Sequence, residues 1–335
     1  MRIRFPRYSL ADILTERLAF KAGLLLSMTE ILNHLNSSSE REIIESSEKH
    51  LIVLRAEDFE QLYLTLLKNT GYLHEDYEPD PAGIAIYHKY KDTSLEPVVQ
   101  GVLKILTTSM RTCVENALKK EVKEWDPKPL FIESLKQFGK DGVTVLSEFL
   151  ACQHAYQMLS FDTNLRYDDW SSTVSLSDLF LSQKNNSESN KFFDQRYIDY
   201  LYKNYSSIEK IHWRKFEELT AEYFQSQGFK VEIGPGSNDD GVDIRVWSPD
   251  DFSEQGIIQC KRVKDKIEKS IVKSLYADVL YNNAMYGLIV TTSELSPGSR
   301  SVISQRGYPI QEINKVNLLK WLNDLKTPGR GISRK

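Results

Sequence analysis

Apolar and polar residues follow a regular order in the last third of the chain. From Ile208 to Gln227 the apolar residues recur every three or four positions, which predicts a helix that ends at Gly228. Phe229–Ile233 and Val242–Trp247 alternate between apolar and polar residues as strands do, and Gly256–Val263 is predicted as another strand. The remaining pattern predicts a helix over Lys266–Asn283, a strand over Tyr286–Thr292, a short helix from Ser296, a strand over Tyr308–Ile313 and a helix over Lys315–Leu325. This order, α-β-β-β-α-β-α-β-α, predicts an α/β domain with a mixed sheet flanked by helices.

The preceding part of the chain has a helical pattern instead. Apolar residues at helical spacing over Leu10–Leu35, Ala56–Asn69 and Glu96–Lys120 predict a mostly α-helical N-terminal domain. A polar stretch over residues 182–191 contains no large apolar residue and is typical of an exposed linker. We therefore expect a helical recognition, regulatory or assembly region over residues 1–181, a linker over 182–195, the α/β domain over 196–326 and a basic flexible tail over 327–335.

Composition fits two ordinary globular cores. The chain has 335 residues, of which 41% are hydrophobic and 27% are charged. Its three cysteines, Cys113, Cys152 and Cys260, are widely separated, so neither a disulfide framework nor a zinc cluster is indicated. No stretch is long and apolar enough to span a bilayer, and no signal peptide pattern is visible. These features predict a cytoplasmic protein with no membrane partner.

The net charge of −4 is unevenly distributed. Before residue 206 there are about 24 Lys and Arg against about 30 Asp and Glu, and after it about 19 against about 17. A few cations near a site matter more than such totals, so this balance permits contact with DNA without demonstrating it.

Polar side chains on neighbouring strands suggest a catalytic centre. If Val242–Trp247 alternates strictly, Asp243 lies on the face opposite Val242 and Ile244, and Gln259 and Lys261 share one face of the next strand. A carboxylate and an amide oxygen are ligands suited to Mg²⁺ or Mn²⁺, and an ammonium beside them can orient a water molecule or stabilise charge on a phosphate. Glu217 in the preceding helix is a further oxygen ligand candidate.

Each of these residues also has an ordinary structural explanation. An isolated Asp beside a glycine turn is usually a turn residue, and Glu217, Glu218 and Glu222 together are compatible with a solvated helix face. Their order along the chain and the preceding helix favour an active site over these alternatives.

The same residues resemble a known catalytic core. Phe216-Glu217, Asp239-Asp240-Gly241-Val242-Asp243-Ile244 and Ile258-Gln259-Cys260-Lys261-Arg262 are similar to the core of Mrr-like restriction endonucleases, members of the PD-(D/E)XK nuclease superfamily. Ile289-Val290-Thr291-Thr292-Ser293 resembles the strand that follows in that family. The resemblance covers roughly the C-terminal third. It implies a metal-dependent endonuclease that hydrolyses DNA in restriction of or defence against foreign DNA, with catalytic Asp243, Gln259 and Lys261 and with Glu217 at the position of the family's helix glutamate. Gln259 stands where the broader superfamily has an acid, which leaves one-metal and two-metal mechanisms open.

A basic run follows the second catalytic strand. Arg262, Lys264 and Lys266 are candidates for phosphate contact, although such runs are usually solvated surface. Two other functions remain open: a DNA-binding module that has lost cleavage, and a nuclease effector that the N-terminal region activates on binding a ligand or partner. A homo-oligomer formed through that region is also compatible with the sequence, and nothing in residues 1–200 decides between a sensor and a DNA reader.

Overall fold

The computed structural model describes residues 2–119, 125–168, 170–182, 191–236, 241–250, 255–328 and 330. The chain divides into two compact units, residues 1–72 with 170–329 and residues 73–169 with 330–335. The boundaries predicted from the sequence stay predictions. Residues 183–190 of the predicted linker, 237–240 of the family-like motif, and 329 and 331–335 of the predicted tail lie outside the described residues.

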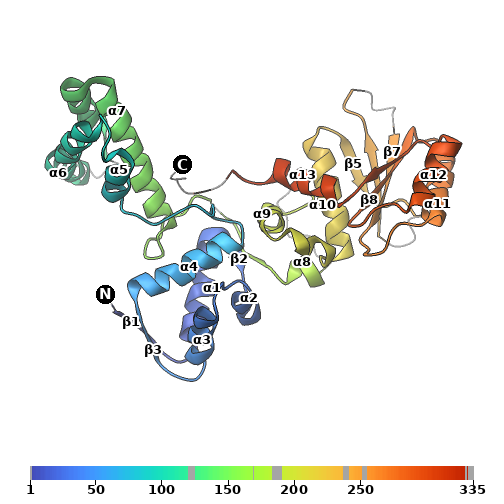
Figure 1. The fold of residues 1–335 in the computed structure, drawn as a ribbon, viewed down its shortest axis with the longest axis horizontal. Coiled ribbons are helices and arrows are strands. Elements are labelled where there is room, and N and C mark those ends of the chain that lie inside the picture. Colours follow the sequence, from blue (N-terminus) through green and yellow to red (C-terminus); the bar gives the residue numbers. More distant parts are fainter. Residues whose placement is uncertain are drawn as a thin grey trace. The chain divides into compact units, whose positions relative to one another are not determined.

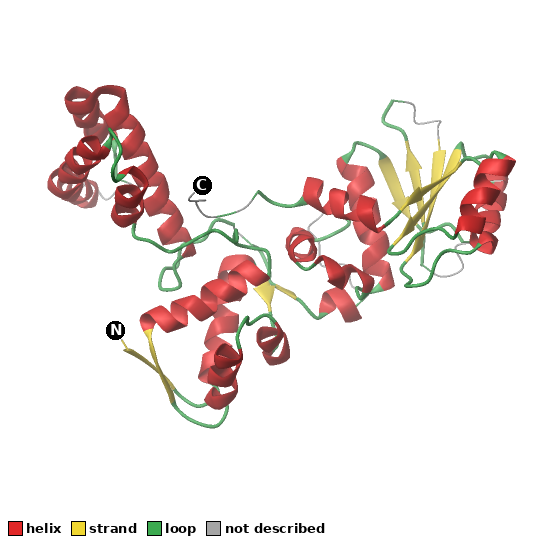
Figure 2. Ribbon diagram, viewed as in Figure 1, coloured by secondary structure: helices red, strands yellow, loops and turns green. Residues whose placement is uncertain are grey.

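A five-stranded mixed sheet forms the centre of the C-terminal part (Figure 2). Its strands, in order across the sheet, are β5 (Lys230–Ile233), β6 (Ile244–Trp247), β7 (Gln255–Lys261), β8 (Tyr286–Thr291) and β9 (Ile310–Ile313). Strands β5, β6 and β7 are antiparallel, whereas β7, β8 and β9 are parallel. The predicted mixed sheet is therefore confirmed, as is its element order.

Helices cover the sheet (Figure 1). They are α10 (Trp213–Ser226), α11 (Lys269–Tyr281), α12 (Pro297–Arg306) and α13 (Lys315–Leu325). Helix α10 contacts β5, β6, β7 and α13, while α11 contacts β7, β8 and α12. Under α11 lies a core that includes Val242, Ile257, Val272 and Ile289, all at most 1% exposed. Burial of these apolar side chains supplies the main stabilisation that fixes the ends of β6 and β7.

Local signals explain where these helices begin and end. The Ser296 side chain accepts a hydrogen bond from Ser299 N–H, and Pro297 occupies the first helical position of α12. Gly307, with φ 62°, ends that helix in the left-handed conformation. Asn314 forms a capping box at the start of α13.

The other elements of the first unit come from both ends of its sequence. They are β1 (Arg2–Phe5), α1 (Ser9–Ala22), β2 (Leu24–Leu25), α2 (Met28–Asn33), α3 (Ser38–Ser47), β3 (Ile52–Arg55), α4 (Ala56–Asn69), β4 (Val174–Ser175), α8 (Asp178–Leu181), α9 (Gln195–Lys203) and the 3-10 helix η1 (Tyr205–Glu209). Strand β1 pairs with β3 and β2 with β4. Hydrogen bonds from Arg196 Nη1 to Gly23 O (3.1 Å) and from Asn204 Nδ2 to Asn69 O (2.7 Å) connect the two sequence segments.

The second unit is helical, with α5 (Ala82–Tyr90), α6 (Glu96–Lys119) and α7 (Lys128–Leu159). Its core includes Ile86, Val99, Val102 and Leu146, one or two from each helix. Helix α7 is interrupted at Gly139, where φ is 61° and ψ is −144°. The mostly helical character predicted for the N-terminal region is confirmed.

The stretch Leu10–Leu35, in which the apolar spacing indicated helix, contains two helices instead of one. Helix α1 ends at Gly23, whose φ is 68°. Leu24 and Leu25 then pair with Val174 and Ser175 in a parallel ladder, and α2 starts only after Ser27 caps it. A glycine in the left-handed conformation ends a helix at little steric cost, so the apolar spacing continues across a break in the backbone. None of the helices in the described ranges combines the length and apolarity needed to cross a membrane.

Candidate active site

Asp243 lies just before β6, where the ladder with β7 is irregular. Ile244 is the register partner of Ile258, yet the N–H of Asp243 also donates to Ile258 O at 3.1 Å. Two successive residues therefore oppose one, which is the pattern of a β-bulge. A bulge breaks the strict alternation of faces. The alternation predicted for Val242–Trp247 is therefore wrong at its start, because Val242 packs in the core under α11 and Ile244 does not. Bulges of this kind commonly redirect a side chain beside an active site.

The carboxylate of Asp243 is held at the backbone of β7. Its Oδ2 accepts the N–H of Cys260 at 2.6 Å, and the backbone O of Asp243 accepts the N–H of Gly234, the residue after β5, at 2.8 Å. Cys260 lies between Gln259 and Lys261 in the sequence. The Asp243 carboxylate is therefore held beside the backbone of β7 between Gln259 and Lys261.

The Gln259 side chain is buried, with 5% of its surface exposed. Its amide oxygen, Oε1, is fully buried and accepts no hydrogen bond from any described residue. An ideal Cβ placed on Gly241 would lie 3.6 Å from Gln259 Nε2 and 3.5 Å from Asp278 Oδ2, so the amide nitrogen lies beside this glycine and α11. A buried acceptor without a donor costs about 1–3 kcal/mol, which makes Gln259 an unusual residue to bury without a function.

Lys261 ends β7 and has a firmly held backbone. Its carbonyl O accepts the Thr291 hydroxyl at 2.8 Å and Thr292 N–H at 3.3 Å. Its side chain is half-buried and makes no ion pair within the described ranges. The point at which the Lys261 side chain leaves β7 is therefore fixed.

Glu217 lies on α10 and is 6% exposed. Arg214 lies one turn earlier, and its Nη1 donates a hydrogen bond to Glu217 Oε2 at 2.9 Å. The same Nη1 donates to Gly234 O at 2.8 Å. Gly234 is also the residue that bonds the backbone of Asp243. Arg214 therefore links the helix glutamate to the loop that precedes Asp243, a connection that the sequence pattern did not reveal.

The three helix glutamates are buried rather than solvated, so the surface explanation for them is wrong. Glu218 pairs with Lys215 at 2.7 Å inside the fold. Glu222 accepts the N–H groups of Phe192 and Phe193 at 2.7 and 3.1 Å. These two carboxylates have structural partners elsewhere, whereas Glu217 is connected through Arg214 to the residue that bonds the backbone of Asp243.

The thiol of Cys260 shows that Asp243 and Glu217 approach the same region. Burial raises the pKa of this thiol well above its usual value, and the negative charges of Asp243 and, to a smaller degree, Glu217 raise it further. Its Sγ lies 3.6 Å from Thr220 Oγ1 on α10. The thiol therefore faces α10, within electrostatic range of both carboxylates.

The candidate metal ligands are oxygen atoms of mixed type. Within the described residues, no group of three His, Cys, Asp or Glu side chains is placed to hold a metal ion. A divalent ion at this site would need the amide oxygen of Gln259 in addition to carboxylates. Mg²⁺ accepts such oxygen ligands, and the buried Oε1 without a donor is compatible with a cation that completes its coordination.

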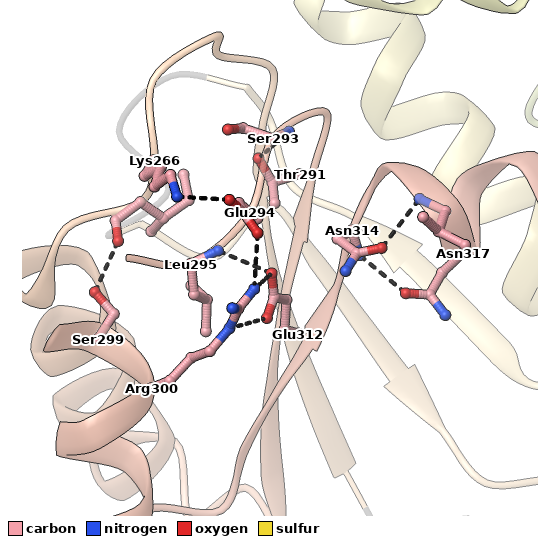
Figure 3. Close-up of polar contacts among 12 residues, drawn as sticks. Lys266, Thr291, Ser293, Glu294, Leu295, Ser299, Arg300, Glu312, Asn314 and Asn317 are labelled. Atoms are coloured by element: carbon pink, nitrogen blue, oxygen red, sulfur yellow. Dashed lines mark hydrogen bonds and ion pairs between the residues drawn. The ribbon is translucent and has the colours of Figure 1, made fainter. Parts of the chain in front are cut away.

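The cations of the basic run have different surroundings. Arg262 Nη1 donates to Glu209 O at 2.8 Å, so this side chain anchors η1. Lys266 pairs with Glu294 at 2.7 Å, and Arg300 connects Glu294 to Glu312 (Figure 3). Lys264 is exposed. Of the three cations predicted to contact phosphate, Lys264 is the one whose side chain makes no hydrogen bond or ion pair with a described residue.

A family comparison identifies this part of the chain. Residues 208–322 match the model of the Mrr catalytic domain, a restriction endonuclease family. The C-terminal third is a restriction endonuclease domain. The resemblance predicted from its motifs is thus confirmed for this region, and the domain is that of a nuclease. No match was found among the curated proteins compared with the chain.

One solved structure is similar in part. It is the MspJI restriction endonuclease in complex with a 27-mer oligonucleotide, with 17% sequence identity and a TM-score of 0.26. The alignment covers 56% of this chain and 39% of that chain, so this chain spans well under half the length of the neighbour.

Proposed function

We propose that the chain is a metal-dependent DNA endonuclease whose site consists of Asp243, Gln259, Lys261 and Glu217. The observation that supports the metal most directly is the buried Gln259 Oε1, which accepts no hydrogen bond from a described residue. The restriction endonuclease domain supports a phosphodiester as the substrate. Restriction of foreign DNA is the role that this domain favours.

In this proposal Asp243, Gln259 and Glu217 hold Mg²⁺, or Mn²⁺ in its place, through oxygen atoms. When bound, the ion would polarise the scissile phosphate and lower the pKa of a water ligand. The Cys260 N–H fixes the Asp243 carboxylate in one orientation, at 2.6 Å. The Arg214 guanidinium holds Glu217 Oε2 and thereby limits the directions in which this carboxylate can turn.

Lys261 provides the remaining chemical group. Its backbone is clamped by Thr291 and Thr292, so its ammonium starts from a fixed point at the end of β7. Placed beside the phosphate, it would orient the attacking water and stabilise the negative charge that develops in the transition state. An ammonium in this role contributes through its charge, so a neutral side chain of similar length should bind DNA but cleave it slowly.

Cleavage assays on several polymers test this function. Supercoiled and linear duplex DNA, methylated and unmethylated, and RNA would be incubated with Mg²⁺, with Mn²⁺ or with EDTA, using wild type, Lys261→Met and the control Lys264→Met. We expect metal-dependent nicking or cutting of duplex DNA by wild type and by the Lys264 variant, and a loss of about 10²–10³-fold in the Lys261 variant. Cleavage that continues in EDTA, or that is equal in both variants, would contradict the proposal.

A further inference from the structure

The two-stranded ribbon of β1 and β3 has one apolar face and one cationic face. Strand β1 lies beside β3 (Figure 1), and their register pairs Arg2 with Arg55, Ile3 with Leu54, Arg4 with Val53 and Phe5 with Ile52. Directly opposed residues of an antiparallel pair lie on the same face. Ile3, Phe5, Ile52 and Leu54 therefore form one face, and Arg2, Arg4, Val53 and Arg55 form the other.

Burial fixes which face is turned to solvent. Phe5 is 2% exposed and stacks on Phe59 of α4 with ring centroids 5.2 Å apart, and Leu54 is 7% exposed. Arg2, Arg4 and Arg55 are exposed, and Val53 is 47% exposed. The apolar face is thus anchored on the helices of residues 1–72, and the arginines point outward.

The arrangement of these arginines does not stabilise the fold. Arg2 is directly opposite Arg55, and like charges in that position are destabilising. Arg55 is compensated by Asp58, at 2.7 Å, but within the described residues Arg2 and Arg4 form no ion pair. These two guanidinium groups are available to a partner of opposite charge.

A strained aromatic residue lies at the end of the ribbon. Tyr8 has φ 68°, a left-handed conformation that costs a residue with a Cβ about 1–2 kcal/mol, and it is 48% exposed. The Arg7 guanidinium stacks over its ring at 4.4 Å, and Arg7 Nε donates to Glu48 O at 2.8 Å. Strain of this kind persists where the surrounding structure enforces it, and it concentrates at functional sites.

From this ribbon we infer a second DNA contact, made by Arg2 and Arg4 on the phosphate backbone of duplex DNA. The inference rests on the proposed function, because it takes the same DNA as the partner. A two-stranded β-ribbon is narrow enough to enter the major groove, and arginine binds phosphate oxygens through paired N–H groups. The exposed Tyr8 adds an aromatic surface beside these cations. This cationic face stands out because residues 1–205 contain an excess of acids, about 30 against about 24 cations.

Binding without cleavage provides the test. The full-length protein in EDTA would be titrated into a fluorescein-labelled 30-base-pair duplex, and anisotropy would be measured from 0.05 to 0.3 M salt. The variants are Arg2→Ala/Arg4→Ala and a control with the same change in charge, Lys136→Ala/Lys140→Ala, on exposed positions of α7. Each phosphate contact makes the negative slope of log K against log salt steeper by about 0.9, so the slope of the ribbon variant should be shallower by about 1.8. This change corresponds to roughly hundredfold weaker binding at 0.05 M salt.

Several results would overturn the inference. One is a ribbon variant that binds duplex DNA with the affinity and salt slope of the control. If this variant also aggregates, Arg2 and Arg4 only protect an exposed strand edge from pairing with other chains. Another is wild-type binding to single-stranded RNA or to phosphatidylserine vesicles that the ribbon variant loses while duplex binding is unchanged. Circular dichroism melting of both variants establishes that they are folded.

The two proposals fail separately. If wild type binds duplex DNA through the ribbon but never cleaves it, the nuclease proposal fails and the ribbon contact stands. If wild type cleaves DNA and the ribbon variant binds and cleaves like the control, the ribbon inference fails and the nuclease proposal stands.

Discussion

Gln259→Met removes the buried amide oxygen while keeping an unbranched side chain of similar length. Gln259 Oε1 is buried and accepts no hydrogen bond from a described residue. In the absence of a metal ion, such an acceptor destabilises the fold by about 1–3 kcal/mol. We therefore expect the metal-free variant to be at least as stable as wild type and up to about 2 kcal/mol more stable, because methionine fills the space without an unsatisfied group.

Added metal should reverse this order. A ligand that binds only the folded state stabilises it by about 2.7 kcal/mol when its concentration is 100 times Kd. Wild type should gain this stability with Mg²⁺, whereas Gln259→Met should gain much less. Gln259→Glu is the matched control: a second carboxylate near Asp243 should destabilise the metal-free protein and increase the gain with Mg²⁺.

Thermal unfolding in EDTA and in Mg²⁺ measures both effects. Tryptophan fluorescence reports mainly on the nuclease domain, which contains three of the five tryptophans, Trp213, Trp247 and Trp321. A change of 1 kcal/mol moves Tm by about 2–4 °C for a domain of 150–250 residues and by more for a smaller one. A metal-free Gln259→Met protein that is less stable than wild type by more than about 1 kcal/mol would refute the reasoning, since it would mean that Oε1 has a donor in the folded protein. Equal stabilisation of the wild type and the methionine variant by Mg²⁺ would show that Gln259 is not a ligand.

Four further outcomes test the surroundings of the site. Burial raises the pKa of Glu218 despite its pair with Lys215, so the folded protein binds the Glu218 proton more tightly than the unfolded chain does. The contribution of Glu218 to the free energy of unfolding should therefore fall as pH rises above the usual glutamate range. In urea unfolding, Glu218→Gln should lack this fall. Replacing Lys215 alone by Met should cost about 3–5 kcal/mol in the same assay at pH 7, because a buried carboxylate loses its cation. Gly241→Ala should lose about 1–2 kcal/mol because φ is +84°, and Gly241→Asn should lose less in parallel melts. Arg214→Gln should lower the cleavage rate at saturating Mg²⁺ by about 10–100-fold with partial recovery in Arg214→Lys, and an unchanged rate would remove Arg214 from the positioning of Glu217.

Local periodicity predicted the helices and strands of the nuclease domain because the residues within each element specify its type. The alternation in β5 and β6, the turn around Gly234 and the Ser296-Pro297 start of α12 each lie within a few residues of the element that they specify. The order of strands and helices could therefore be predicted without knowledge of the tertiary fold. Pairing of distant segments could not: β2 and β4 are only two residues long and lie about 150 positions apart.

The residues of the candidate site are a prediction from the sequence, whereas their geometry could not be predicted from it. Residue types and order indicated Asp243, Gln259, Lys261 and Glu217. The bulge at Asp243 depends on one extra backbone hydrogen bond to Ile258, which no residue type specifies. The link from Arg214 to Glu217 and Gly234 is likewise a result of packing, since a cation three residues before a glutamate on a helix is usually a surface pair.

The most direct test of the central claim is Asp243→Asn assayed for cleavage of supercoiled DNA in Mg²⁺. Asparagine keeps the size of the side chain and can still accept the Cys260 N–H, so the fold should persist while the negative charge is lost. Asp324→Asn, on the exposed surface of α13, removes one carboxylate elsewhere and serves as the control. We predict that wild type and the Asp324 variant cleave DNA at similar rates, and that Asp243→Asn is folded but slower by at least about 10²-fold. Metal-dependent cleavage by Asp243→Asn at the wild-type rate would contradict the assignment of this site.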